Sequence, residues 1–185
     1  RDAGVDAQDP VALSRPLELD GKTETVAFEN VMFDGGLPGV FVFACHHVTP
    51  RLTRARNDWQ LHANTSTALA EIVIGADDPA AYRPALERLF GFDHVADAPH
   101  GVSVILGNSA LAVMNSVGLT QRFGRKALEG LPPAPGIAAL SFLVNEADAA
   151  GAMLDMARIP YADGHHGLTI AAAHAGGVIV ELAED

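Results

Sequence analysis

Residues 70–92 read AEIVIGADDPAAYRPALERLFGF, and this stretch decides the fold that we predict for the 185-residue chain. The run from Glu71 to Ile74 is rich in β-branched residues and predicts a strand. Pro79 is typical of the first position of a helix, and Gly91 is typical of the residue that ends one. The stretch therefore predicts a strand followed by a helix.

A second stretch repeats this order. Residues 137–161 read IAALSFLVNEADAAGAMLDMARIPY, which predicts a strand over 138–144 and a helix from about residue 147 to about residue 157. Self-similarity at a fixed distance along a chain indicates two copies of one structural unit.

The residues that follow the two predicted helices also correspond. HGVSVILGNSALAVMN begins at His100 and HGLTIAAAHAGGVIVEL begins at His166, and each reads as two strands joined by a turn. With a weak strand admitted near Val95 and another near Tyr161, each copy has the order strand, helix and three strands, or βαβββ.

The first third of the chain resembles the back half of another copy. Residues 11–45 hold three strand-like runs, separated by turns at Asp20-Gly21 and at residues 34–36. Residues 1–4 look like the end of a helix, with Gly4 as its C-terminal glycine. We therefore expect the start of this unit to precede residue 1. The predicted division is a partial module over 1–48, a connection over 49–67, a complete module over 68–116, a linker over 117–136 and a complete module over 137–185.

Composition excludes several classes of protein. The chain is 49% hydrophobic and 19% charged, with a net charge of −11 and a pI near 5.0, so we expect no nucleic acid partner. No apolar run approaches the roughly 20 residues of a membrane span, and the first residues do not resemble a signal peptide, so we predict a cytoplasmic protein. The single cysteine, Cys45, excludes an internal disulfide and is expected to be a buried, unreactive thiol.

Five motifs carry a resemblance to a known family: LSRPLELDGKTETVAF from residue 13, PGVFVFACHHVTP from residue 38, NDWQLHAN from residue 57, LAEIVIGADDPAAYRPALERLFG from residue 69 and the closing VIVELAED. They resemble the glyoxalase-like domain proteins of the vicinal oxygen chelate superfamily, which includes glyoxalases, bleomycin resistance proteins and extradiol dioxygenases. The resemblance implies an α+β fold in which paired βαβββ modules form curved, mostly antiparallel sheets.

The resemblance also implies where a metal would lie. Metal-using members take a His from the first strand of a unit and a Glu from the last, around a divalent ion such as Zn, Mn, Ni or Fe. Glu181 falls on the closing-strand position and Glu71 on a first-strand position, but Ala139 stands at the first-strand position of the last unit. Two carboxylates without an imidazole make a poor site, so we expect no metal there. Glu71 and Glu181 could instead share a proton and act as catalytic acid and base.

The adjacent histidines His46 and His47 must point to opposite faces of a strand. Strand parity places Phe41, Phe43 and His47 on one face. His47 is the candidate metal ligand, and the alternative is that its imidazole satisfies backbone groups at the corner before Pro50.

Five further residues are candidates for substrate binding. Arg15 could hold an anionic substrate or pair with a carboxylate, and Trp59 could line a pocket or pack against the core. His62 lies in a polar segment that has little need of an imidazole for packing. Phe41 and Phe43 would supply the apolar lining.

These observations support two main hypotheses. The first is an enzyme of lyase, isomerase or dioxygenase type acting on a small oxygen-rich metabolite, with a site that could hold a metal and lies mainly before residue 1. The second is a non-catalytic protein that binds or sequesters a small molecule. We expect a homodimer, and a third hypothesis is a scaffold that self-associates through sheet edges. Phosphoryl transfer, nicotinamide chemistry and serine hydrolysis lack their motifs.

Overall fold

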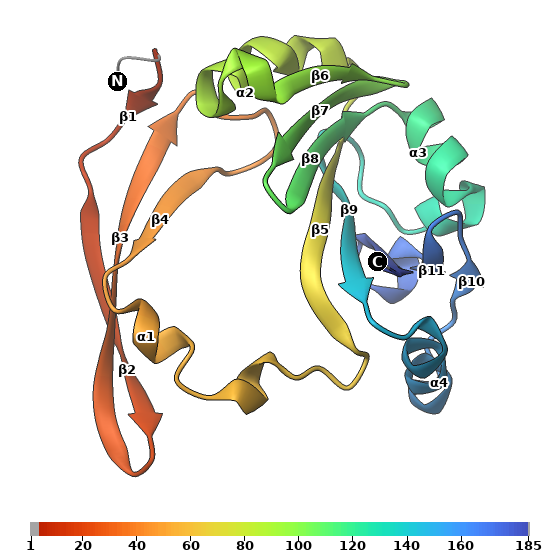
Figure 1. The fold of residues 1–185 in the computed structure, drawn as a ribbon. Coiled ribbons are helices and arrows are strands. Elements are labelled where there is room, and N and C mark those ends of the chain that lie inside the picture. Colours follow the sequence, from red (N-terminus) through yellow and green to blue (C-terminus); the bar gives the residue numbers. More distant parts are fainter. Residues whose placement is uncertain (1–3, 185) are drawn as a thin grey trace. The chain divides into compact units, whose positions relative to one another are not determined.

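The computed structural model describes residues 4–184 and divides the chain into two compact units (Figure 1). Unit 1 consists of Arg1–Leu37 and Phe41–Gln60, and unit 2 consists of Pro38–Val40 and Leu61–Asp185. Residues 1–3, where a helix end was expected, lie outside the described residues. Over the described range, no helix is long and apolar enough to cross a membrane.

Unit 1 is a small antiparallel sheet. Its strands are β1 (Asp6–Ala7), β2 (Val11–Leu19), β3 (Lys22–Asp34) and β4 (Phe43–His47), and β3 pairs with the other three. Strands β2 and β3 form a hairpin whose turn residues Asp20 and Gly21 have φ of 51° and 76°. Such positive φ values suit the Asp-Gly pair, so this predicted turn is confirmed. Helix α1 (Pro50–Thr53) and the 3₁₀ turn η1 (Asn57–Gln60) follow.

Strand β4 differs from the prediction in two respects. It begins at Phe43, so Phe41 lies before the strand and its side chain is exposed. The thiol of Cys45 is exposed as well, which contradicts the expectation of a buried cysteine. Among the described strands, β4 pairs with β3 alone, and all of its residues are exposed, which accounts for the exposure of Cys45.

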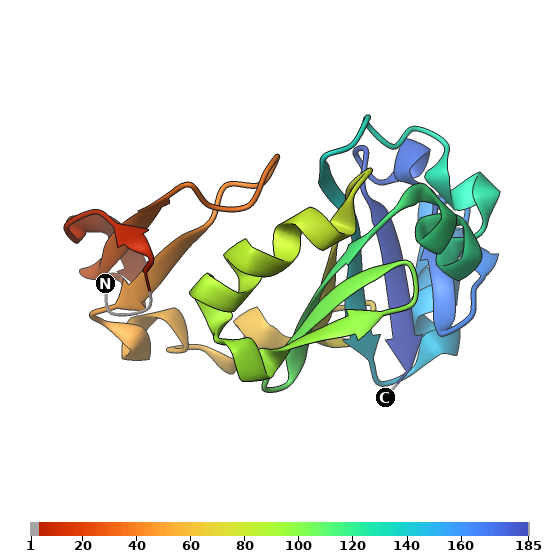
Figure 2. The same cartoon turned by 90° about the horizontal axis from the view of Figure 1, so that it is seen from above.

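Unit 2 is built on an eight-stranded curved sheet with the order β10-β11-β12-β9-β5-β8-β7-β6 (Figures 1 and 2). The strands are β5 (Ser66–Gly75), β6 (Val95–Ala98), β7 (Gly101–Leu106), β8 (Ser109–Met114), β9 (Gly136–Val144), β10 (Ala162–Asp163), β11 (Gly167–Ile170) and β12 (Ile179–Glu184). The helices and 3₁₀ turns are η2 (Pro79–Tyr82), α2 (Arg83–Phe90), η3 (Phe92–His94), α3 (Ser116–Phe123), η4 (Arg125–Leu128), α4 (Ala147–Ala157) and η5 (Ala172–His174).

The first strands of the two repeats meet at the centre of this sheet. Strand β5 pairs antiparallel with β9, and each of them pairs in parallel with the last strand of its own repeat, β8 or β12. Each repeat has the order βαβββ, so the predicted α+β fold of paired βαβββ modules is confirmed. The exact residues at which one module gives way to the next stay a prediction.

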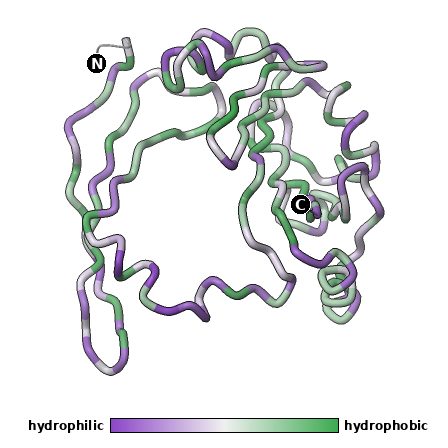
Figure 3. The backbone as a smooth tube through the Cα atoms, viewed as in Figure 1, coloured by the Kyte–Doolittle hydropathy of each residue, from purple (hydrophilic) through white to green (hydrophobic). Residues whose placement is uncertain are grey.

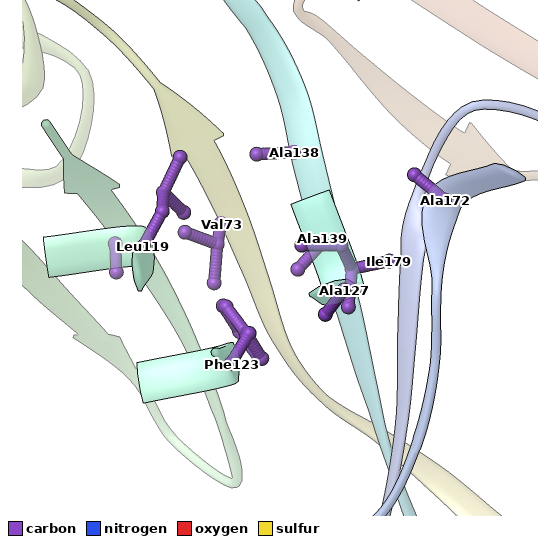
Figure 4. Close-up of a cluster of buried hydrophobic side chains, with 9 residues drawn as sticks. Val73, Leu119, Phe123, Ala127, Ala138, Ala139, Ala172 and Ile179 are labelled. Carbon is purple, nitrogen blue, oxygen red and sulfur yellow. The ribbon is translucent and has the colours of Figure 1, made fainter. Parts of the chain in front are cut away.

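The sheet of unit 2 has two differently covered faces. We call the face that carries Glu71, Val73, Ala139 and Ile179 the first face, because pairing aligns these side chains on alternate positions of adjacent strands. Leu119 and Phe123 of α3 pack on it, as Figure 4 shows. The second face carries Phe142, Val144, Val180 and Leu182 and is covered in part by α4.

Helix α3 lies in the segment that was predicted to be a linker. The Asn115 side chain caps it by accepting a hydrogen bond from the Gly118 N–H at 3.0 Å. Leu119 and Phe123 are four residues apart and are both buried, so the helix is held by tertiary packing. Its sequence, SVGLTQRF, contains β-branched residues and a glycine, which explains why propensity alone did not predict it.

Candidate functional sites

One row of side chains crosses the middle of the first face of unit 2. Glu181 on β12 pairs with Ser141 on β9, Ser141 pairs with Glu71 on β5, and Glu71 pairs with Ala110 on β8. The two glutamates that the sequence singled out therefore lie in the same row, with only Ser141 between them.

One residue of the row differs from the sequence expectation. Ser141, and not Ala139, is the residue of β9 that pairs with Glu181, and Ala110 of β8 pairs with Glu71. Similar sequence phrases in the two repeats do not determine which residues face each other, because that depends on the register in which β9 pairs with β12 and β5 pairs with β8.

Arg122 of α3 joins the two glutamates. Its guanidinium donates hydrogen bonds to Glu71, to Oε2 of Glu181 at 2.8 Å and to Oγ of Ser141 at 3.2 Å. The Ser141 hydroxyl donates to Oε2 of Glu181 at 2.6 Å. Glu181 is 1% exposed, whereas the side chain of Arg122 is 18% exposed. We call Glu71, Arg122, Ser141 and Glu181 the arginine cluster.

The electrostatics of the arginine cluster favour a permanent cation. Burial by itself would lower the pKa of Arg122, but the hydrogen bonds and charges of Glu181 and Glu71 outweigh it and raise the pKa above its ordinary value. The guanidinium thus links the two carboxylates, and the catalytic roles predicted for Glu71 and Glu181 stay predictions.

The sequence identified Glu71 and Glu181 as candidates but did not identify Arg122. The only signal for it was the spacing of Leu119 and Phe123, which marks one face of a helix and places residue 122 next to that face. Arg122 also lies against the ring of Phe123, with its guanidinium carbon 4.8 Å from the ring centroid.

The residues of the arginine cluster do not fit a divalent metal centre. The four positions of the central row hold two carboxylates, a hydroxyl and a methyl group, and a guanidinium already binds the carboxylates. Across residues 4–184, no group of three or more His, Cys, Asp or Glu side chains could hold a metal ion.

A second set of candidates shares one face of the unit 1 sheet, which we call the unit 1 face. Pairing aligns Arg15 with Val26, His47 with Phe28 and Phe43 with Met32, and all of these β3 partners are an even number of residues apart. Arg15, Phe43 and His47 therefore point to the same side.

The opposite side of β4 carries His46. Its imidazole lies 3.6 Å from the carboxylate of Glu29, and both side chains are exposed. The two histidines thus face opposite ways, as strand parity predicts. The corner before Pro50 is satisfied by other groups, since the Val48 N–H donates to the Ala27 carbonyl and the Ala27 N–H donates to Oγ1 of Thr49.

Asn30 adds a polar group that the sequence did not single out. It pairs with Cys45 and so lies on the unit 1 face, and it is only 8% exposed. Its side-chain oxygen is buried without a hydrogen-bond partner. The ring centroid of Phe28 lies 6.3 Å from that of the His47 imidazole, and the ring centroids of Phe41 and Phe43 are 5.7 Å apart, so aromatic rings lie beside His47 and beside Phe43.

Arg15 has no ion-pair partner among the described residues. Residues 4–184 therefore do not contain the ion pair between Arg15 and a carboxylate that was the alternative to substrate binding. Its guanidinium is free to hold an anion beside the unit 1 face.

Trp59 and His62 lie on the polar connection after α1, which Figure 3 colours as mostly hydrophilic. Trp59 belongs to unit 1 and is half-exposed, with the guanidinium of Arg56 at 5.9 Å from its ring centroid. His62 belongs to unit 2 and lines a cavity of about 400 Å³ on the second face, together with Ser66, Leu69, Phe142, Val180 and Leu182. The binding roles of Trp59 and His62 stay predictions.

Comparison with known proteins places these sites in context. The model of the glyoxalase-like domain family matches residues 1–90. A search of the curated proteins finds no match. A hypothetical protein from Staphylococcus aureus superimposes on the whole chain with a TM-score of 0.62 at 9% identity, and the chain spans 59% of that protein.

Two methylmalonyl-CoA epimerases are also similar. The enzyme from Mycobacterium tuberculosis is 18% identical over 67% of this chain and 91% of its own, with a TM-score of 0.48. The enzyme from Streptomyces coelicolor is 17% identical over 65% of this chain and 95% of its own, with a TM-score of 0.47.

Proposed function

We propose that the chain is a glyoxalase-like protein of the vicinal oxygen chelate superfamily and that it binds a small oxygen-rich molecule at the unit 1 face; the match of the glyoxalase-like domain model to residues 1–90 supports the first part of this proposal. One observation carries this proposal: Arg15, Asn30 and His47 lie on the same face of one sheet, among exposed or half-buried apolar side chains.

The three polar groups define the chemistry of the ligand. The Arg15 guanidinium suits a carboxylate, which it can bind through two hydrogen bonds. The buried oxygen of Asn30 requires a donor, which a ligand hydroxyl would supply. Phe28 and Phe43 offer contact to an apolar portion. The ligand that fits is a small hydroxy or oxo acid with an apolar portion.

In the enzymatic form of the proposal, His47 moves a proton on this ligand. Imidazole is the side chain best suited to proton transfer near neutral pH, which supports lyase or isomerase chemistry. The alternative is binding without turnover. A divalent ion at His47 would need ligands that residues 4–184 do not supply, so no step is assigned to a metal.

Ligand titration of matched variants tests the binding site. Arg15→Ala should weaken the binding of a 2-hydroxy or 2-oxo acid by about 10- to 150-fold, since a hydrogen bond to a charged group contributes about 1.5–3 kcal/mol. His47→Ala should weaken it by about 2- to 12-fold, as expected for a neutral hydrogen bond of about 0.5–1.5 kcal/mol. Calorimetry with a panel of such acids measures both effects.

The controls remove the same groups elsewhere in unit 1. His46→Ala deletes the imidazole on the opposite side of β4, and Arg54→Ala deletes a guanidinium at the end of α1. Equal losses in Arg15→Ala and Arg54→Ala would contradict the proposal. Product formation that His47→Ala abolishes, with ligand affinity largely kept, would distinguish an enzyme from a binding protein.

We also propose that the chain forms a homodimer. Strand β2 pairs only with β3 among the described strands, and its Val11 and Leu13 are exposed, so its free edge can pair with another copy. Light scattering on the purified protein should give twice the chain mass, and Leu13→Lys should shift the mass toward one chain. A monomeric wild type at micromolar concentration would contradict this.

A further inference from the structure

We infer that Arg122 supplies, from within the chain, the positive charge that a divalent ion would give to Glu71 and Glu181. The first face of unit 2 is thereby closed to metals, and removal of Arg122 creates a site for a divalent cation. This inference concerns unit 2 and does not depend on the ligand proposed for unit 1.

The charge of the two carboxylates requires a cation. Glu181 is 1% exposed, and Glu71 lies two strands away in the same row. An ionised carboxylate buried at this depth is stable only if it is paired and hydrogen-bonded. Arg122 contacts both carboxylates, and Ser141 adds a second donor to Glu181.

Packing fixes the guanidinium at this position. The neighbouring residues Leu119 and Phe123 are buried with Val73 and Ile179 of the sheet. Arg122 itself lies over the ring of Phe123. Arg122 is therefore part of the closed first face, unlike a surface arginine that could swing aside.

The groups left without Arg122 would suit a hard divalent ion. Glu71 and Glu181 would present carboxylate oxygens, and the Oε1 atom of Glu181 is already buried without a partner. Ser141 adds a hydroxyl, and the exposed part of the arginine cluster would admit water ligands. An oxygen-only donor set of this kind favours Mg²⁺ or Mn²⁺ over softer metals.

Arg122→Ala in the full chain tests the inference, with Arg125→Ala as the matched control. Arg125 lies three residues further on in η4, carries the same charge and is exposed. The thermal midpoint of Arg122→Ala should fall by about 5–15 °C and rise again in MnCl₂, because an unpaired buried charge is costly. Calorimetry should show at least about tenfold tighter Mn²⁺ binding in Arg122→Ala than in wild type.

Further variants keep the inference falsifiable. Adding Glu181→Gln to Arg122→Ala should abolish the Mn²⁺ binding. If Arg122→Ala does not fold, Arg122→Gln is tested in its place. Should neither fold, Glu71→Gln/Arg122→Met/Glu181→Gln, which removes all three charges at similar volume, should fold. An Arg122→Ala protein as stable as wild type, one that binds Mn²⁺ no more tightly, or a misfolded triple variant would overturn the inference.

Discussion

The contacts of Arg122 show how much of a site a single residue can decide. Its two carboxylate partners are 51 and 59 positions away in the sequence. No local sequence pattern predicts such a contact, because the contact depends on how α3, which lies between the two repeats, packs on the sheet that both repeats form. The glutamates could be predicted from their places in the repeats, whereas their partner could not.

Gly118 is a second residue whose role follows from packing. It lies in the first turn of α3, and a Cβ atom added there would lie 2.8 Å from Cβ of His100. His100 itself has a φ of 63°, so its backbone is already constrained. Neither atom can move away without shifting the backbone.

Gly118→Ala should therefore destabilise the protein although alanine is the better helix former. Helix propensity favours the change by about 1 kcal/mol, but overpacking of this kind costs about 1–3 kcal/mol. We expect a net loss of up to about 2 kcal/mol, which lowers the thermal midpoint by up to about 4–8 °C. Gly136→Ala is the control, because an added Cβ there meets no atom within 4 Å. Equal midpoints for the two variants would contradict the close approach of α3.

At the scale of elements, the sequence predicted the repeats well. The helix expected over 147–157 is α4, and the turn at Asp20-Gly21 joins β2 to β3. These predictions succeeded because hydrophobic periodicity and turn chemistry are local properties.

Predictions that depended on longer-range order failed. Ser141 was missed because its place between Glu71 and Glu181 depends on how β9 pairs with β5 and with β12, which are far apart in the sequence. Cys45 was expected to be buried because its run is apolar, but burial requires a covering layer, and the described residues of unit 1 leave every residue of β4 exposed. Helix α3 was missed because its stability comes from Leu119 and Phe123 packing on the sheet rather than from its own sequence.

At the scale of the whole molecule, the two units differ in how much core they hold. The buried clusters around Val73 and around Leu154 both lie in unit 2, whereas most side chains of β2 and β4 in unit 1 are exposed. Unit 2 also includes residues 38–40, where the buried Tyr82 hydroxyl donates to the Pro38 carbonyl at 2.9 Å. The polar connection around α1 carries the exposed residues Arg51 and Arg54.

Limited trypsin digestion should cut first at Arg51 or Arg54 and leave a resistant fragment that extends to the C-terminus. Proteolysis requires local unfolding, which costs least where few apolar groups are buried, and α1 contains no buried residue. In unit 2, Arg122 is held by the arginine cluster, and the bond after Arg83 leads to Pro84 and is not a trypsin site, so early cleavage at either residue is not expected. Mass spectrometry of the first products locates the cut, and Arg51→Gln/Arg54→Gln should delay it. Earliest cleavage at Arg122 would show that unit 2 is the less stable of the two, because that site becomes accessible only when its core opens.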